Sequence, residues 1–127
     1  MNYLATSINE SPVIVGTATN AITDVRGHAV KFDATGNVVL AGVGDTPLGI
    51  GIMTMGDEGT VAAGAEFTIQ HKDIGYVCAG AEITKGANLS VGANGVFVPT
   101  TSTNPVVAIA LESASAAGQY IPAILRF

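Results

Sequence analysis

The spacing of hydrophobic positions along the chain predicts β-strands. Apolar residues alternate with small or polar ones in five short stretches: Val30 and Phe32; Leu48, Ile50 and Ile52; Phe67 and Ile69; Leu89 and Val91; and Ile109 and Leu111. A period of two is typical of a strand, because successive side chains point to opposite faces of the sheet. Helical spacing is nowhere sustained, and only 113–117 is expected to form a helical turn or two.

Turn-forming residues separate these stretches. Gly, Asp, Asn, Pro and Thr gather at 33–37, 42–47, 56–59, 92–95 and 100–105. Turns at this frequency leave room for strands of about 5 to 7 residues, the ordinary length in an antiparallel barrel or sandwich. We therefore predict an all-β chain that folds as a small antiparallel β-barrel or sandwich of short strands.

The two halves of the chain also resemble each other. The range 27–59 aligns with 86–118 without a gap, and this alignment pairs Gly27 with Gly86, Gly36 with Gly95 and Gly59 with Gly118. The aligned glycines fall at predicted turns, where a positive φ favours glycine. Few of the aligned positions are identical, so a shared set of turn residues is the alternative explanation. A true repeat would mean two related modules within one closed or nearly closed barrel.

Glycine and alanine occupy the alternate face of two aligned stretches, 49–52 and 108–111. Such small residues let another backbone approach closely. The approaching backbone is either the facing sheet of the same barrel or a neighbouring subunit.

The amino-terminal segment, 1–20, differs from the rest. It is rich in Ser, Thr and Asn and holds one isolated apolar stretch at 13–15. A single short strand cannot bury itself, so this stretch must pair with its own barrel, with a sister subunit or with the open edge of another protein. We predict an extended arm at 1–20 and a single domain at 21–127. The candidate capsid or subunit contacts in the arm are Pro12, Val13, Ile14 and Val15.

Composition and charge exclude several classes of protein. The formal net charge is −5, and the five Lys and Arg residues never form a run, which disfavours nucleic-acid binding. No apolar run approaches the ~20 residues of a membrane-spanning helix, and 1–20 lacks the basic start and apolar stretch of a signal peptide. The single Cys78 cannot close an intrachain disulfide. We expect a protein made in a reducing compartment, without membrane contact.

Residues that could carry chemistry are scattered. Cys78 lies a short way after His71, but it sits in an apolar stretch where a thiol is an unreactive hydrophobe. His28 has no second His or Cys at a ligand spacing. Asp45 and the Asp57–Glu58 pair could offer oxygens to calcium, but no calcium-loop motif surrounds them. We predict no catalytic residue, no metal site and no cofactor.

Several segments of the sequence resemble the small capsid decoration (cement) proteins of tailed bacteriophages. The resemblance covers about 27–127. Its residues are Gly27-His28-Ala29-Val30-Lys31-Phe32-Asp33-Ala34-Thr35-Gly36-Asn37-Val38-Val39-Leu40, Asp45-Thr46-Pro47-Leu48-Gly49-Ile50-Gly51-Ile52, Ile83-Thr84-Lys85-Gly86-Ala87-Asn88-Leu89, Val107-Ala108-Ile109-Ala110-Leu111-Glu112-Ser113-Ala114, and the end from Ala117 to Phe127.

This resemblance implies a compact, β-tulip-like module that trimerises and attaches to the outside of the phage head. The implied function is a non-enzymatic structural virion protein that binds the assembled shell between capsomers and stabilises it. The implied partners are the major capsid protein and two further copies in a homotrimer, and the implied location is the outer capsid surface after synthesis in the host cytoplasm. The alternative is a surface-displayed β module that binds a host receptor or carbohydrate. Such modules usually expose aromatic platforms, whereas most aromatic residues here are predicted to lie in the core.

Overall fold

The computed structural model describes residues 11–52, 59–101 and 103–127. These residues form ten short strands and one 3-10 turn, η1 (Ala93–Gly95), so the all-β prediction is confirmed. The strands are β1 (Val13–Thr17), β2 (Ala29–Phe32), β3 (Val38–Leu40), β4 (Gly49–Gly51), β5 (Glu66–Gln70), β6 (Ile74–Cys78), β7 (Asn88–Val91), β8 (Phe97–Pro99), β9 (Ala108–Ala110) and β10 (Tyr120–Leu125).

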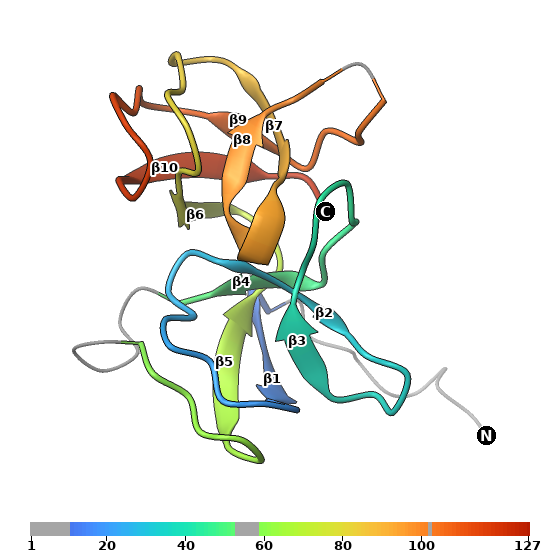
Figure 1. The fold of residues 1–127 in the computed structure, drawn as a ribbon. Coiled ribbons are helices and arrows are strands. Elements are labelled where there is room, and N and C mark those ends of the chain that lie inside the picture. Colours follow the sequence, from blue (N-terminus) through green and yellow to red (C-terminus); the bar gives the residue numbers. More distant parts are fainter. Residues whose placement is uncertain (1–10, 53–58, 102) are drawn as a thin grey trace.

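The strands make two five-stranded antiparallel sheets, one from each half of the chain. The amino-terminal sheet has the order β1-β5-β4-β2-β3, and the carboxy-terminal sheet has the order β6-β10-β9-β7-β8. Figure 1 shows the second sheet above the first, with the β7–β8 hairpin reaching down to β4 and β2. The turn between β5 and β6 carries the chain from one sheet into the other.

The two sheets have the same topology when β1 to β5 are matched to β6 to β10. The strands β2, β3 and β4 match β7, β8 and β9 at the same shift that pairs Gly27 with Gly86 in the sequence. The difference in residue number between matched strands is slightly larger for β1 and β6 and smaller for β5 and β10. The matched positions therefore extend beyond 27–59 and 86–118, with shifts that follow the lengths of the connecting loops.

Glycines mark the matched turns. Gly27 and Gly86 both have a positive φ, and so do Gly36 and Gly95. Beyond β4 the pairing differs from the expected one. Gly64 donates its N–H to the Ala18 carbonyl just as Gly118 donates to that of Ala79, each at 2.8 Å. Gly64 therefore takes the place expected of Gly59, because the connection before β5 is longer than the one before β10.

The core has two parts that follow the same matching. One cluster lies within the amino-terminal half and includes Val30 and Val38, whose matched residues Leu89 and Phe97 lie in the other. The cluster of the carboxy-terminal half also takes in Ala29, Ala41 and Ile50 from the first half. The two sheets therefore share a buried seam.

Main-chain contacts hold the seam together. The Gly27 carbonyl accepts a hydrogen bond from the Cys78 N–H at 2.8 Å, and the Gly44 N–H donates to the Val91 carbonyl at 3.1 Å. Gly95, in η1, lies so close to Ala29 that an added Cβ would come within 2.5 Å of the Ala29 carbonyl oxygen. Ala29 and Gly95 therefore mark the approach of one sheet to the other. At the stretch 49–52, where small residues were expected to admit another backbone, Gly49 lies against the Gln70 carbonyl and Gly51 against the Val25 carbonyl, both in the same half of the chain.

The predicted amino-terminal arm is only partly described. Residues 1–10 lie outside the described residues. Val13–Thr17 form β1, which pairs antiparallel with β5 of the same chain, and Ala18 is buried. Of the three pairings that the sequence left open for this segment, the structure shows pairing with its own body. No helix forms at 113–117, where one or two helical turns were expected.

Candidate interaction surfaces

Cys78 and His71 have separate environments. The Cys78 side chain is buried at the end of β6, and burial, followed by the nearby negative charge of Asp24, raises the pKa of its thiol. The His71 ring instead lies 2.6 Å from the carbonyl oxygen of Ser11, at the start of the β1–β5 pair. A thiol with a raised pKa is a poor nucleophile. Nothing in this geometry makes the two side chains a catalytic pair.

The acidic candidates organise turns. Asp33 accepts hydrogen bonds from the Thr19 and Thr35 hydroxyls, which lower the pKa of its carboxyl from 3.8 to about 2. Asp45 accepts from the Lys31 ammonium at 2.7 Å and from the Gly42 N–H at 2.7 Å, and both lower its pKa. A carboxylate oxygen already bound to an ammonium is a poor calcium ligand.

The remaining candidates give no metal site. His28 places its Nδ1 2.8 Å from the carbonyl oxygen of Arg26. Asp57 and Glu58 lie outside the described residues. Within 11–52, 59–101 and 103–127, no three His, Cys, Asp or Glu side chains gather where they could hold a metal ion. The same part of the chain contains no helix that could span a membrane.

A polar network ties the two sheets together at one side of the seam. The Arg26 side chain donates two hydrogen bonds to Asp24, from Nε to Oδ1 at 3.0 Å and from Nη2 to Oδ2 at 3.1 Å, and the Arg26 backbone N–H donates to Oδ1 at 3.0 Å. Tyr120 donates its hydroxyl to Asp24 at 2.9 Å. Burial alone would raise the pKa of Asp24, but these hydrogen bonds outweigh it and keep the pKa below its usual value. Burial and the Asp24 contact raise the pKa of Tyr120 to about 12. The network therefore keeps a charged carboxylate and a neutral phenol at the junction.

The predicted contact residues lie at an edge of the first sheet. The strand β1 is the first strand of that sheet, and Val13–Thr17 pair only with β5. Directly after β1 the two edges of the sheet meet, because Ala18 bridges Val38 of β3 and the Thr19 N–H donates to the Val38 carbonyl at 3.0 Å. Pro12, Val13 and Val15 are exposed, Val15 to 64%, while Ile14 points inward and packs against the first core cluster. The exposed valines are thus available to a partner, although the strand itself belongs to the sheet.

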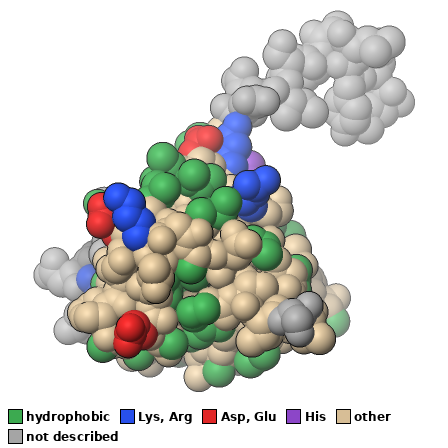
Figure 2. Space-filling model, turned by 90° about the horizontal axis from the view of Figure 1, so that it is seen from above, with side chains coloured by type: hydrophobic (Ala, Val, Ile, Leu, Met, Phe, Trp, Pro, Cys, Tyr) green, Lys and Arg blue, Asp and Glu red, His purple; other side chains and the backbone are tan. Residues whose placement is uncertain are grey.

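Sequence reasoning missed a second apolar surface, on β6 and β10. Ile74 and Tyr76 are 59% and 53% exposed, and their cross-strand partners Ile124 and Pro122 are also partly exposed. The expectation that most aromatics lie in the core is wrong for Tyr76 and also for Phe32. In Figure 2, hydrophobic side chains reach the surface in groups, and basic and acidic side chains lie beside the upper group.

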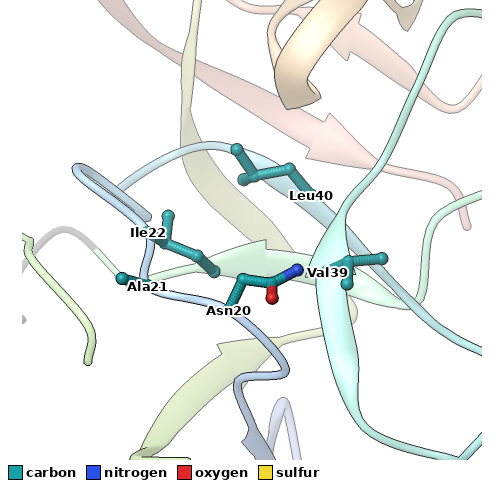
Figure 3. A pocket seen from close by; sticks show the side chains of 5 residues that line it. All are labelled: Asn20, Ala21, Ile22, Val39 and Leu40. Carbon is teal, nitrogen blue, oxygen red and sulfur yellow. The ribbon is translucent and has the colours of Figure 1, made fainter. Parts of the chain in front are cut away.

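Three hollows in the surface are lined mainly by apolar side chains. One of about 190 Å³ is lined by Asn20, Ala21, Ile22, Val39 and Leu40. Figure 3 shows these side chains, which come from the segment after β1 and from β3. A second hollow, of about 220 Å³, lies at the seam between the sheets and includes Ile50, Gln70, Ile74 and Tyr76 in its lining. A third, of about 400 Å³, is lined by Ile14, Pro47, Leu48, His71 and Phe127. The ionisable side chains in these three linings, His71 and Tyr76, lie in different hollows.

Comparison with known proteins shows a similarity in structure. No family model matches the chain, and no curated protein matches it in sequence. The fold, however, is similar to the crystal structure of the gp8.5 N base of the head fiber of bacteriophage phi29. The TM-score is 0.67 at 22% sequence identity, and the match covers 89% of this chain and 92% of that chain. The chain therefore shares the fold of a phage head fiber base.

Proposed function

We propose that this chain is a non-enzymatic structural protein of a bacteriophage head. The observation that carries the proposal is the fold similarity to the base of a head fiber, which extends over nearly the whole of both chains. The resemblance of 27–127 to capsid decoration proteins points to the same class of protein independently of that structure.

The proposed mechanism is binding to the outside of the assembled shell, between capsomers, as a homotrimer. A protein that binds the assembled shell but not separated capsid subunits stabilises the assembly by mass action. Three linked contacts to the shell would raise the overall affinity well above that of one contact. The proposed partner is the major capsid protein, and no bond is made or broken.

The proposed shell contact is the outer face of β1, at Pro12, Val13 and Val15. These residues are exposed and apolar, and Val13 and Val15 lie on β1, which pairs only with β5 over Val13–Thr17, so its other side can accept a further strand there. Ile14 supports this face from beneath, because its side chain packs on the first core. The contact therefore needs no rearrangement of the sheet.

The test is co-sedimentation of the purified chain with phage heads assembled without it. We expect saturable binding to heads and no binding to separated capsid subunits. The Val15→Glu variant should lose at least tenfold in affinity for heads, whereas Val43→Glu should bind as the wild type does. Val43 is a matched control, because it is 67% exposed and lies in the loop after β3, the strand at the opposite edge of the sheet.

Failure of the wild-type chain to bind any head would overturn the proposed function. Equal binding by the Val15→Glu and Val43→Glu variants would leave head binding in place and remove β1 from the contact. A glycan array separates the alternative, because selective binding to a carbohydrate by a chain that ignores heads would make it a receptor-binding module.

A further inference from the structure

The hollow of about 220 Å³ at the seam, which we call the Tyr76 hollow, joins apolar walls to two polar groups. Ile50 and Ile52 line it from the first half of the chain, and Ile74 and Tyr76 line it from β6. Gln70, at the end of β5, completes the lining. Figure 1 shows β6 at the side of the second sheet that faces β4. Sites for drug-sized molecules measure ~300–1,000 Å³, so this smaller hollow has room for a single ring.

The Gln70 amide brings an unused hydrogen-bond acceptor to the hollow. Its Nε2 donates to the carbonyl oxygens of Lys72 and Ile74, each at 2.9 Å. These two bonds use both N–H groups and fix the orientation of the amide, because a flipped amide would point its oxygen at two carbonyl oxygens. Oε1 accepts no hydrogen bond from any residue within the described ranges. An occupant that buried this oxygen without donating to it would lose affinity.

Gly75 brings the Gln70 amide against β6. An added Cβ at this position would lie 2.9 Å from Gln70 Oε1 and 2.8 Å from Ile50 Cδ1. Gly75 does not have a positive φ, so its backbone conformation does not require glycine. The close approach of the Gln70 and Ile50 side chains explains the glycine instead. A side chain at position 75 would displace the acceptor from the lining that both residues share.

Tyr76 adds an aromatic ring to the lining. Its side chain is 53% exposed, and its hydroxyl has no hydrogen-bond partner in the part of the chain that the structure describes. The face of an aromatic ring carries partial negative charge and attracts polarised C–H groups, while the hydroxyl both donates and accepts hydrogen bonds. The expected burial of most aromatic residues disfavoured carbohydrate binding, and Tyr76 is an exposed exception beside a hollow.

The charge around the hollow favours a neutral ligand. Among the described residues of its lining, none is charged. The whole chain carries a formal net charge of −5. A sialylated or phosphorylated ligand would therefore meet no cation in the hollow and would be repelled by the chain as a whole.

We infer that the Tyr76 hollow binds one neutral sugar ring of a glycan. A pyranose presents C–H groups on one face and hydroxyls at its edge, so it stacks on Tyr76 and donates a hydroxyl to Gln70 Oε1. An apolar side chain of a partner protein has no such donor and leaves Oε1 unpaired. The inference goes beyond the proposed function, which needs no ligand other than the shell.

The test is a glycan array probed with the full chain, followed by titration with the methyl glycoside of the terminal sugar of the best-bound glycan. The array carries neutral glycans that end in glucose, galactose, mannose or N-acetylglucosamine, and sialylated glycans beside them. We expect binding to a neutral glycan and none to the sialylated ones. Tyr76→Ala should weaken binding by at least about tenfold, the effect of losing a stacked ring. Phe32→Ala should bind as the wild type does, because Phe32 is 54% exposed but does not line this hollow.

A second measurement uses the wild-type chain alone. It compares deoxy analogues of the bound sugar, each with one hydroxyl replaced by hydrogen. One of them should bind at least about tenfold more weakly, because it leaves Gln70 Oε1 without a donor. Circular dichroism checks that each variant is folded. A wild type that binds no neutral glycan would overturn the inference, and so would undiminished binding by folded Tyr76→Ala or equal binding of all the deoxy analogues.

Head binding separates this inference from the proposed function. Tyr76→Ala should co-sediment with phage heads as the wild type does. If the wild type binds no glycan and Tyr76→Ala loses head binding, the hollow contacts the shell; the inference is then overturned and the proposed function stands. A wild type that binds the glycan but no head would support the inference and overturn the proposed function.

Discussion

The substitution of Gly95 by alanine tests how the two halves are joined. Gly95 has a φ of 77° and lies in the turn between β7 and β8. An alanine Cβ there would come within 2.5 Å of the Ala29 carbonyl oxygen and 3.0 Å of its nitrogen. Ala29 is in the middle of the seam and fully buried, so its backbone cannot move away without disturbing the packing of both cores.

Gly36 provides a matched control. It takes the corresponding place in the β2–β3 turn and has a φ of 86°, but an added Cβ there would meet nothing within 4 Å. Both substitutions therefore place alanine in the left-handed region, which costs about 1 kcal/mol after the gain from a stiffer unfolded chain. Only Gly95→Ala also forces atoms into the seam, and such overpacking costs a further ~1–3 kcal/mol.

The assay is urea unfolding followed by circular dichroism, with thermal unfolding as a second measurement. We expect Gly36→Ala to lower the free energy of unfolding by about 1 kcal/mol and Gly95→Ala by about 2–4 kcal/mol. At roughly 3–4 °C per kcal/mol for a chain of this size, the melting temperatures should differ by several degrees. Equal destabilisation by the two variants would refute the close packing of the β7–β8 turn on β2.

Three further predictions concern the polar network, the thiol and the acid response. Tyr120→Phe removes the hydroxyl that donates to Asp24 and should destabilise the chain by about 1–2 kcal/mol in urea unfolding, whereas no change would mean that the network adds nothing to the seam. Cys78 should react with a thiol reagent only slowly in the native chain and fully in urea; fast native reaction would contradict its burial and raised pKa. Because the folded pKa of Asp33 is about 2 against 3.8 in the unfolded chain, its stabilisation is complete above about pH 4 and disappears as the pH falls towards 2. The Asp33→Asn variant should therefore show a smaller decrease in melting temperature over that pH range. An unchanged decrease would mean that the protonation of other carboxylates causes it.

The sequence was most informative where a strand has one buried and one exposed face. Phe67 and Ile69 on β5 alternate with Thr68 and Gln70, and the predicted strand is present. The paired glycines were also visible, since the left-handed turns at Gly36 and Gly95 require the same residue wherever the fold repeats them.

The same reasoning explains what the sequence concealed. Ile74, Tyr76 and Val77 do not alternate with polar residues, because both faces of β6 are apolar, so no strand was predicted there. The nearby Cys78 and His71 were considered instead as candidates for a catalytic pair. A continuous apolar run between two turns is itself a signal of a strand covered on both sides. That signal would have pointed to the apolar surface on β6 and β10.

The correspondence between the two halves could not be obtained from sequence alone beyond β4. The shift that pairs Gly27 with Gly86 holds for three strands, but the loops before β5 and β10 differ in length. Sequence alignment without gaps therefore paired Gly118 with Gly59, while the hydrogen bonds pair it with Gly64. Loop length varies more freely than strand pairing, because a longer surface loop costs little free energy.

The most direct measurement of the central claim is electron cryo-microscopy of phage heads assembled without this chain and then mixed with it. The account predicts additional density on the outer surface of the shell, at positions between capsomers, into which the two-sheet fold can be placed with β1 towards the shell. Heads that remain bare, or density confined to the inside of the shell, would contradict it.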